Sequence, residues 1–98
     1  MVKNVIWSPQ AVHNYNGILL YLLEKWSLDI AKKYELTVYN LIDTIIDNPF
    51  IGMESTIYTS LRRILITKHS FLIYRTSSND LEIVDIFDTR RDLDIVLF

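Results

Sequence analysis

All five arginines of the chain fall where predicted strands begin or end: Arg62, Arg63, Arg75, Arg90 and Arg91. Guanidinium groups that converge on one cleft can bind phosphate or carboxylate oxygens through paired hydrogen bonds. Neighbouring strand residues point to opposite faces, so only one of Arg62 and Arg63 can line a common cleft. The alternative is a solvated edge on which the arginines pair with nearby acids: Asp85, Asp88 and Asp92.

Groups that could transfer a proton are few, because the chain has only two histidines. His13 is expected on the surface of a helix, next to Asn14. His69 follows Lys68 in a turn-like segment, where it is either a turn residue or a general acid or base. His69 is therefore the one histidine that the sequence offers for catalysis.

The sequence contains no residue pattern that is typical of a metal site or a cofactor site. There is no cysteine, and the histidines and acids do not show the spacing of metal ligands. The two glycines do not form a phosphate-binding loop, and no nucleophile motif of the G-x-S-x-G type occurs. We therefore predict no cofactor and no metal.

Composition predicts one globular domain over residues 1–98, since half of the residues are hydrophobic. The net charge of −2 argues mildly against a general nucleic-acid binder, although residues 61–75 carry four basic side chains and no acid. No apolar run is long enough to span a membrane. The absence of cysteine fits a cytoplasmic protein.

The first half of the chain predicts a strand and two helices. A short strand at residues 2–7 precedes Ser8 and Pro9, which are typical of a helix start. Apolar spacing then predicts a helix over 9–25, with Gly17 where another helix crosses closely. Ser27 or Asp29 caps a second helix, which Pro49 ends, so the two helices form an antiparallel hairpin.

The second half predicts a loop over 50–60 and an antiparallel meander of strands at 61–67, 71–76 and 81–87, with the first strand at its edge. The fold class is therefore α+β, a helix hairpin on a small, mainly antiparallel four-stranded sheet in the order β-α-α-β-β-β. A short apolar tail follows at 93–98. The core is predicted to contain Leu19, Leu22, Val38, Leu41, Ile45, Leu65, Ile73 and Ile83.

Several short segments, in this order, resemble the RelE/ParE toxin superfamily of bacterial toxin–antitoxin modules. They are WSPQA at 7–11, YLLEKWS at 21–27, AKKYE at 31–35, NPFIG at 48–52, LRRILI at 61–66, FLIYR at 71–75 and IFDTRRD at 86–92. The resemblance covers nearly the whole chain. It implies a small cytoplasmic toxin that a cognate antitoxin neutralises in a hetero-oligomeric complex, by laying an extended and helical segment across the helices and sheet.

Two activities divide this superfamily: RelE-like members cleave mRNA on the ribosome, and ParE-like members poison DNA gyrase. This chain departs from the nuclease pattern at Ile66, where an arginine is common, and at Asp88, where a histidine is common. Its tail ends in Leu97 and Phe98, without the usual tyrosine or histidine. The resemblance is therefore closer to the ParE-like branch and implies a gyrase poison.

Three hypotheses follow from the resemblance. In the first, a gyrase poison recognises its target through Arg62, Arg63, Arg75, Arg90 and Arg91. In the second, a ribosome-dependent and metal-independent endoribonuclease uses His69, Tyr74 and Arg91, with Arg62 or Arg63 on the scissile phosphate. In the third, a degenerate and non-toxic member only binds its antitoxin.

Apolar residues off the main helical stripes point to the antitoxin site. Leu20, Leu28 and Leu36 are expected to be exposed on the helix hairpin. They could form a groove for an amphipathic helix of the partner.

Overall fold

The computed structural model describes residues 2–92, and its first half is a strand followed by a helix hairpin. β1 (Asn4–Trp7) leads into α1 (Pro9–Lys25), and α2 (Leu28–Asp47) follows after a short turn. The Ser8 hydroxyl accepts a hydrogen bond from the Ala11 amide at 3.0 Å, and Ser27 caps α2 through the Ile30 amide at 3.1 Å. The predicted start and end of α1 are confirmed, and Ser27 rather than Asp29 is the second cap.

The second half supplies four strands: β2 (Met53–Glu54), β3 (Arg62–Thr67), β4 (Ser70–Ser77) and β5 (Asp80–Asp88). They form a five-stranded sheet in the order β1-β5-β4-β3-β2, in which only the β1–β5 pair is parallel. The predicted edge position of β1 is confirmed. The prediction of four strands missed β2, because two residues are too few to show an alternating pattern.

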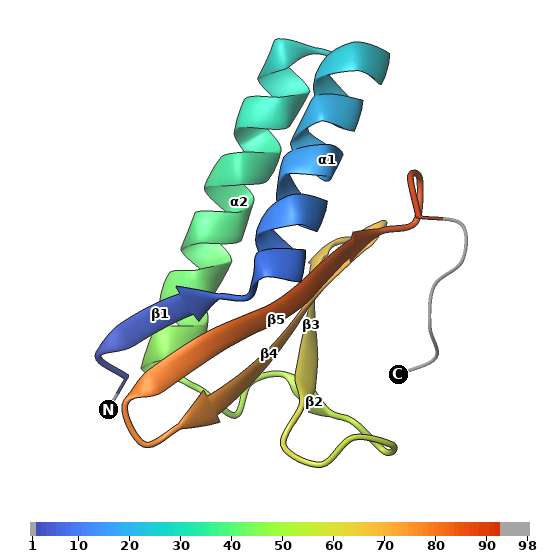
Figure 1. Ribbon diagram of the computed structural model, residues 1–98. Helices are drawn as coiled ribbons and strands as arrows, with labels where there is room; N and C mark the ends of the chain where they lie inside the picture. The colour runs from blue at the N-terminus through green and yellow to red at the C-terminus, as the bar shows by residue number, and fades with distance from the viewer. Residues whose placement is uncertain (1, 93–98) are drawn as a thin grey trace.

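Both helices lie on the same face of the sheet, as Figure 1 shows, and the hydrophobic core fills the space between the two layers. Residues from α1, α2 and the three long strands build this core, among them Ile18, Leu22, Val38, Leu72 and Ile83. The predicted α+β layer arrangement is therefore correct. The predicted apolar tail at 93–98 lies outside the described residues.

The prediction that Leu65 belongs to the core is wrong, since this residue is 67% exposed. Ile64 and Ile66 on either side of it face the helices, so strand alternation directs Leu65 to the opposite face. Ile73 is only half-buried, because it pairs with Arg63 on that same outer face. The core thus takes alternate residues from the continuous apolar stretch of β3 at 64–66.

Asp85 joins α1 to the sheet instead of pairing with an arginine. It is buried beside a register shift between β4 and β5. Its carboxylate accepts hydrogen bonds from the side-chain amides of Gln10 at 2.9 Å and Asn14 at 2.7 Å, and from the Ile86 amide at 2.8 Å. These contacts satisfy a buried charge with neutral donors, so the expected pairing of Asp85 with an arginine is wrong.

Candidate functional site

The segment after β5 folds into a tight turn that neutralises its own arginines. The Asp88 carboxylate is fully buried and accepts hydrogen bonds from the amide, Nε and Nη2 of Arg90 at 2.9, 3.0 and 2.7 Å. The amides of Arg91 and Asp92 bond to the Asp88 carbonyl. The Asp88 carboxylate also raises the pKa of the Arg90 guanidinium. Asp88 therefore holds both the shape and the charge of this turn.

Arg90 and Arg91 both lie against α1. The Arg90 guanidinium carbon is 5.9 Å from the centre of the Trp26 ring, within the range of a cation–π contact. Arg91 bonds to Asp92 at 3.0 Å, and its guanidinium lies so close to Gly17 that an added Cβ would be 2.6 Å from Nη2. The expected helix crossing at Gly17 is therefore wrong, since the small residue makes room for an arginine.

The other three arginines are spread along the far end of the sheet. Arg62 donates to the Gly52 carbonyl at 2.8 Å and lies over the Phe50 ring at 5.1 Å. Arg63 lies over the ring of Phe71 at 5.8 Å, and Arg75 forms an ion pair with Glu82. Arg63 is thus the member of the first pair that lies on the outer face of the sheet, the face turned away from the helices.

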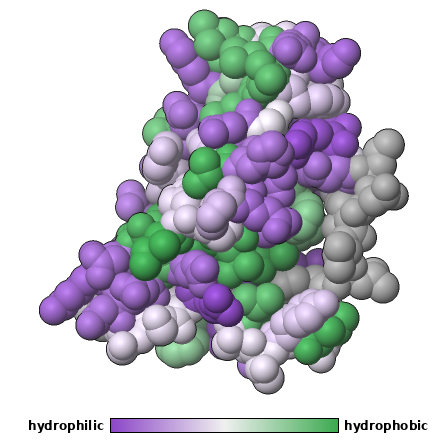
Figure 2. All heavy atoms as spheres, in the orientation of Figure 1, coloured by the Kyte–Doolittle hydropathy of each residue, from purple (hydrophilic) through white to green (hydrophobic). Residues whose placement is uncertain are grey.

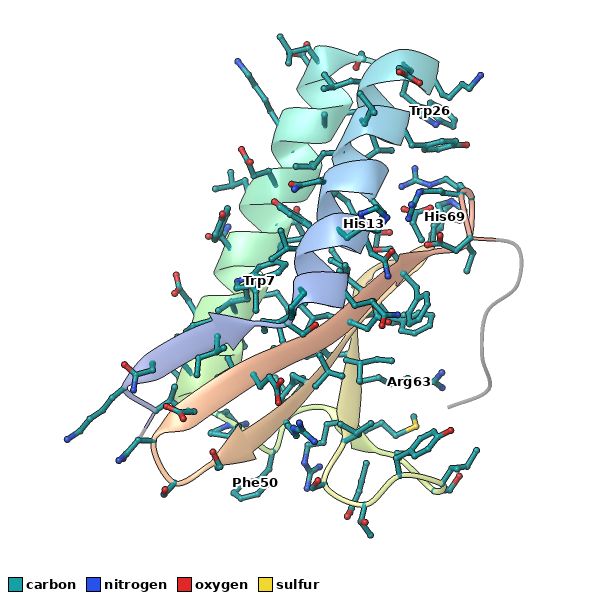
Figure 3. The ribbon with its side chains drawn as sticks, in the orientation of Figure 1. Trp7, His13, Trp26, Phe50, Arg63 and His69 are labelled. Atoms are coloured by element: carbon teal, nitrogen blue, oxygen red, sulfur yellow. The ribbon has the colours of Figure 1, made fainter. Side chains whose placement is uncertain are left out.

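Strand direction separates the predicted nuclease residues. His69 lies in the turn between β3 and β4, where its carbonyl accepts from the Thr89 amide at 2.7 Å, beside the turn that carries Arg91. Tyr74 lies opposite Arg62, at the far end of β3. In Figure 3, His69 accordingly lies well away from Arg63. His69 and Arg91 therefore share one end of the sheet, and Tyr74 belongs to the other.

Tyr74 organises a loop from inside the core. Its side chain is fully buried, and its hydroxyl donates to the Pro49 carbonyl at 2.9 Å and accepts from the Gly52 amide at 2.9 Å. Burial raises the pKa of this hydroxyl. An added Cβ at Gly52 would lie 2.7 Å from the same oxygen, so the glycine is needed for this close approach.

An apolar surface with one arginine occupies the outer face near β2 and β3. We call it the outer-face patch, and it consists of Ile51, Met53, Arg63, Leu65 and Phe71. These side chains and Ile64 line a hollow of about 520 Å³. Met53 and Leu65 are 63% and 67% exposed, and Phe71 packs on Phe87 with ring centres 5.4 Å apart. Large exposed apolar groups beside an arginine are typical of protein-binding surfaces.

A second apolar surface runs between the helices. We call it the helix groove; it joins two hollows, one of about 260 Å³ and one of about 220 Å³. Their linings are Trp7, Val12, Tyr15, Asn16 and Tyr39, and then Leu19, Leu23, Leu28, Ala31, Lys32 and Glu35. Figure 2 shows apolar side chains at the surface of this hairpin. Leu20, Leu28 and Leu36 are exposed as predicted, and Leu28 lines the groove itself.

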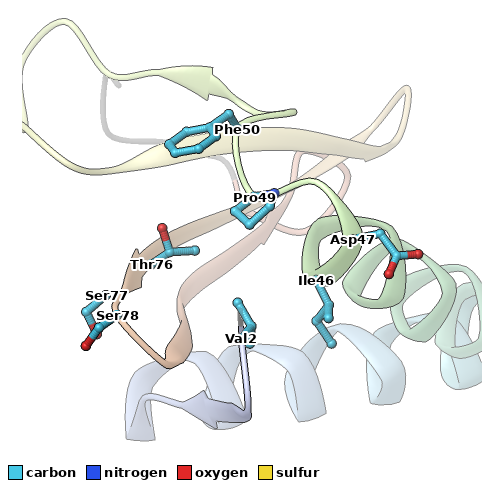
Figure 4. Close-up of a pocket in the computed structure, with 8 residues that line it drawn as sticks. All are labelled: Val2, Ile46, Asp47, Pro49, Phe50, Thr76, Ser77 and Ser78. Atoms are coloured by element: carbon cyan, nitrogen blue, oxygen red, sulfur yellow. The ribbon is translucent and has the colours of Figure 1, made fainter.

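A third hollow, of about 690 Å³, lies between the end of α2 and the turn from β4 to β5 (Figure 4). Its polar side chains are Asp47, Thr76, Ser77 and Ser78. Within residues 2–92, no hydrogen bond joins the hydroxyl of Thr76, Ser77 or Ser78 to the Asp47 carboxylate or to another base, so none of them is an activated nucleophile. Among residues 2–92 there is also no group of three possible metal ligands, and no helix there has the length and apolar character needed to cross a bilayer.

Fold and surfaces together describe a small α+β domain with one apolar, hollowed surface on its helices and another on the outer face of its sheet. The chain matches the profile of the family described as the ParE toxin of the type II toxin–antitoxin system, parDE, over residues 5–93. Because this match spans most of the chain, the protein belongs to the ParE toxin family. No curated protein sequence matches the chain directly.

Solved structures with the same fold come from several bacterial toxin systems. A chain of the chromosomal ParDE system from P. aeruginosa aligns with a TM-score of 0.73 at 13% identity, covering 90% of this chain and 96% of that one. The YoeB dimer from Staphylococcus aureus aligns with a TM-score of 0.63 at 22% identity, covering 87% of this chain and 94% of that one. The E. coli DinJ–YafQ complex aligns with a TM-score of 0.64 at 10% identity, covering 92% of this chain and 96% of that one. The predicted RelE/ParE-like fold is confirmed.

The surfaces that sequence reasoning missed are apolar. The outer-face patch was hidden because Leu65 lies in a continuous apolar run, ILI at 64–66, that reads equally well as core. A strict count of alternation from Ile64 and Ile66 would have placed Leu65 on the outside. Tyr15 of the helix groove gave no signal, since an aromatic residue on a helical stripe reads as core.

Proposed function

We propose that this ParE-family protein is a cytoplasmic toxin that inhibits DNA gyrase by binding to it, without cleaving any nucleic acid. One observation carries the proposal: the outer-face patch combines exposed apolar side chains with a single arginine. Such a surface suits a protein partner, whereas an RNA phosphate backbone requires several uncompensated cations.

The charge pairing of the arginines supports the same choice. Within residues 2–92, Arg75, Arg90 and Arg91 form ion pairs with carboxylates. Arg62 donates to a backbone carbonyl inside the fold, and Arg63 lies over the Phe71 ring. A phosphate-binding cleft built from all five would first have to break these contacts. In this proposal Arg63 contacts the target directly, and Arg62 positions the loop beside the patch.

The distribution of proton-transfer groups also disfavours a ribosome-dependent nuclease. Cleavage of RNA without a metal needs a base and an acid close to the scissile phosphate. The Tyr74 hydroxyl is buried and bonded to two backbone groups, and His69 lies at the opposite end of β3. A binding function needs neither group.

An antitoxin that occupies the helix groove completes the proposal. The groove is apolar and lies between two antiparallel helices, a shape that an amphipathic helix can fill. The S. aureus YoeB–YefM complex, with a TM-score of 0.59 and 21% identity, is one in which a toxin of this fold is bound to an antitoxin. We therefore expect a stable hetero-oligomer with the product of the adjacent gene.

Two matched leucine variants test the target surface. Leu65→Asp places a charge in the outer-face patch, and Leu36→Asp places the same charge on α2; the two leucines are 67% and 62% exposed. Neither change disturbs the core. We expect Leu65→Asp to raise the concentration needed for half-inhibition of gyrase supercoiling at least about tenfold, and Leu36→Asp to leave it unchanged.

A His69→Ala variant and a translation assay address the nuclease alternative. We expect His69→Ala to inhibit gyrase as the unmodified chain does, and a ribosome assay to show no cleaved mRNA. Codon-phased cleavage of mRNA that disappears in His69→Ala would overturn the proposal. A chain that affects neither gyrase nor the ribosome would instead be the non-toxic, antitoxin-binding member.

A further inference from the structure

One buried polar group lies beneath the helix groove without a hydrogen bond. Tyr15 is 7% exposed, and its hydroxyl is the one buried side-chain polar atom in residues 2–92 that has no partner. Its ring packs against Trp7 with centres 5.0 Å apart, so the side chain is held in place. A buried hydroxyl without a partner is costly, and a fold keeps one when something else satisfies it.

One carboxylate, that of Glu35, acts on this hydroxyl. Glu35 and Tyr39 of α2 are close enough to raise the pKa of the Tyr15 hydroxyl further, beyond the main effect of burial. Glu35 lines the neighbouring hollow of the groove and forms no ion pair with any residue in 2–92. Tyr39 is exposed and borders the same hollow as Tyr15.

We propose that the helix groove selects an antitoxin helix carrying a lysine or arginine, whose charged end bonds to both the Tyr15 hydroxyl and the Glu35 carboxylate. This inference rests on the proposed antitoxin complex and names the chemistry of its recognition. The apolar lining, including Leu19 and Leu23, holds the rest of the helix.

A cation fits this place better than a neutral group. An ammonium or guanidinium group has several donors, so one side chain can bond to the phenol oxygen and to a carboxylate at once. A carbonyl oxygen from the partner would satisfy the hydroxyl but would lie near the unpaired charge of Glu35. Since a long basic side chain also covers apolar surface with its methylene stem, it suits a groove of this composition.

The test measures the affinity of the full-length chain for the antitoxin encoded by the adjacent gene, together with the stability of the free chain. Tyr15→Phe removes only the hydroxyl, and Glu35→Gln removes only the charge. Glu24→Gln, on an exposed acid of α1 outside both hollows, is the control. We expect each groove variant to weaken binding about tenfold, the size expected for a hydrogen bond to a charged group.

The two variants are expected to be coupled, so that the double variant binds only slightly more weakly than either single one. The free Tyr15→Phe chain is expected to unfold at the same or a higher urea concentration, because it loses an unsatisfied group. Unchanged affinity in Tyr15→Phe, or a lower unfolding midpoint, would overturn this inference and leave the antitoxin complex standing. An unmodified chain that fails to bind the antitoxin would overturn both.

Discussion

Two adjacent arginines occupy different environments at the end of β5. Arg90 pairs with a carboxylate that has no solvent exposure, whereas the Arg91 and Asp92 side chains remain 26% and 22% exposed. Water can solvate Asp92 when its partner is removed, but it cannot reach Asp88. The same substitution at these neighbouring positions therefore has unequal consequences for the fold.

We expect Arg90→Ala to lower the free energy of unfolding by about 3 kcal/mol, because it leaves the Asp88 charge buried and unpaired. Arg91→Ala is expected to cost less than about 1 kcal/mol, as is usual for a partly exposed pair. Urea unfolding of the two variants measures the difference. An equal loss of unfolding free energy in the two variants would mean that the buried Asp88 carboxylate does not depend on Arg90. Any loss of toxicity in Arg90→Ala has to be corrected for the fraction of the variant that is unfolded.

Within the sheet, Leu65 and Leu72 lie on the adjacent strands β3 and β4, one register position apart, and face opposite sides. Leu72 is fully buried in the core, and Leu65 is exposed on the outer-face patch. Leu72→Ala is expected to cost about 2–5 kcal/mol through lost burial and a cavity, and Leu65→Ala less than about 0.5 kcal/mol. Thermal or urea unfolding checks both, and a large loss in Leu65→Ala would contradict the assigned strand alternation.

The elements of this fold could be predicted because their ends carry strong local signals. Ser8 with Pro9, and Ser27 and Pro49, mark the helix boundaries through caps and a fixed backbone angle, so the helices agree with the prediction almost residue for residue. β2 could not be predicted, since its two residues form a strand only by pairing with β3, which is a tertiary contact.

Residue types in the candidate site could be predicted, but their grouping could be predicted only in part. The sequence identified the five arginines, and the alternative that they pair with nearby acids is correct for Asp88 with Arg90 and for Asp92 with Arg91. It did not indicate that Glu82 pairs with Arg75 or that Gly17 accommodates Arg91. These contacts depend on the register between β4 and β5 and on how α1 lies over the sheet. The order of residues in a single sequence does not specify this register or this packing of α1 on the sheet.

At the scale of the whole molecule, three buried tyrosines make the fold sensitive to alkali. Burial raises the pKa of Tyr15, Tyr34 and Tyr74 above the ordinary value of 10.0. Above pH 10 the unfolded chain loses these protons first and so binds fewer protons than the folded chain. The three tyrosines therefore contribute their full stabilisation below pH 10, and the free energy of unfolding falls as the pH rises above 10.

Each tyrosine contributes a slope approaching about 1.4 kcal/mol per pH unit above pH 10. We expect Tyr34→Phe to remove one such contribution, although it also loses the 2.9 Å hydrogen bond to Ser70 and is less stable at neutral pH. Urea unfolding between pH 8 and pH 11 measures the slope. A Tyr34→Phe chain with an unchanged slope would show that this hydroxyl ionises as easily in the folded state as in the unfolded one.

The helix groove and the outer-face patch lie on opposite sides of the sheet, which has a consequence for neutralisation by the proposed antitoxin. The helices and their groove cover one face, and Arg63, Leu65 and Phe71 belong to the other. A ligand confined to the groove would leave the patch accessible. Only an antitoxin that also extends across the sheet could block the proposed gyrase contact by covering it.

We therefore expect a peptide containing only the helical segment of the antitoxin to bind the chain without relieving its inhibition of gyrase. At saturating peptide, half-inhibition in the supercoiling assay is expected to change less than about twofold, because peptide and target use separate surfaces. Full-length antitoxin is the positive control and is expected to restore supercoiling. If the helical peptide alone restored activity, the target surface would have to include the helices, and the outer-face patch would lose its assigned role.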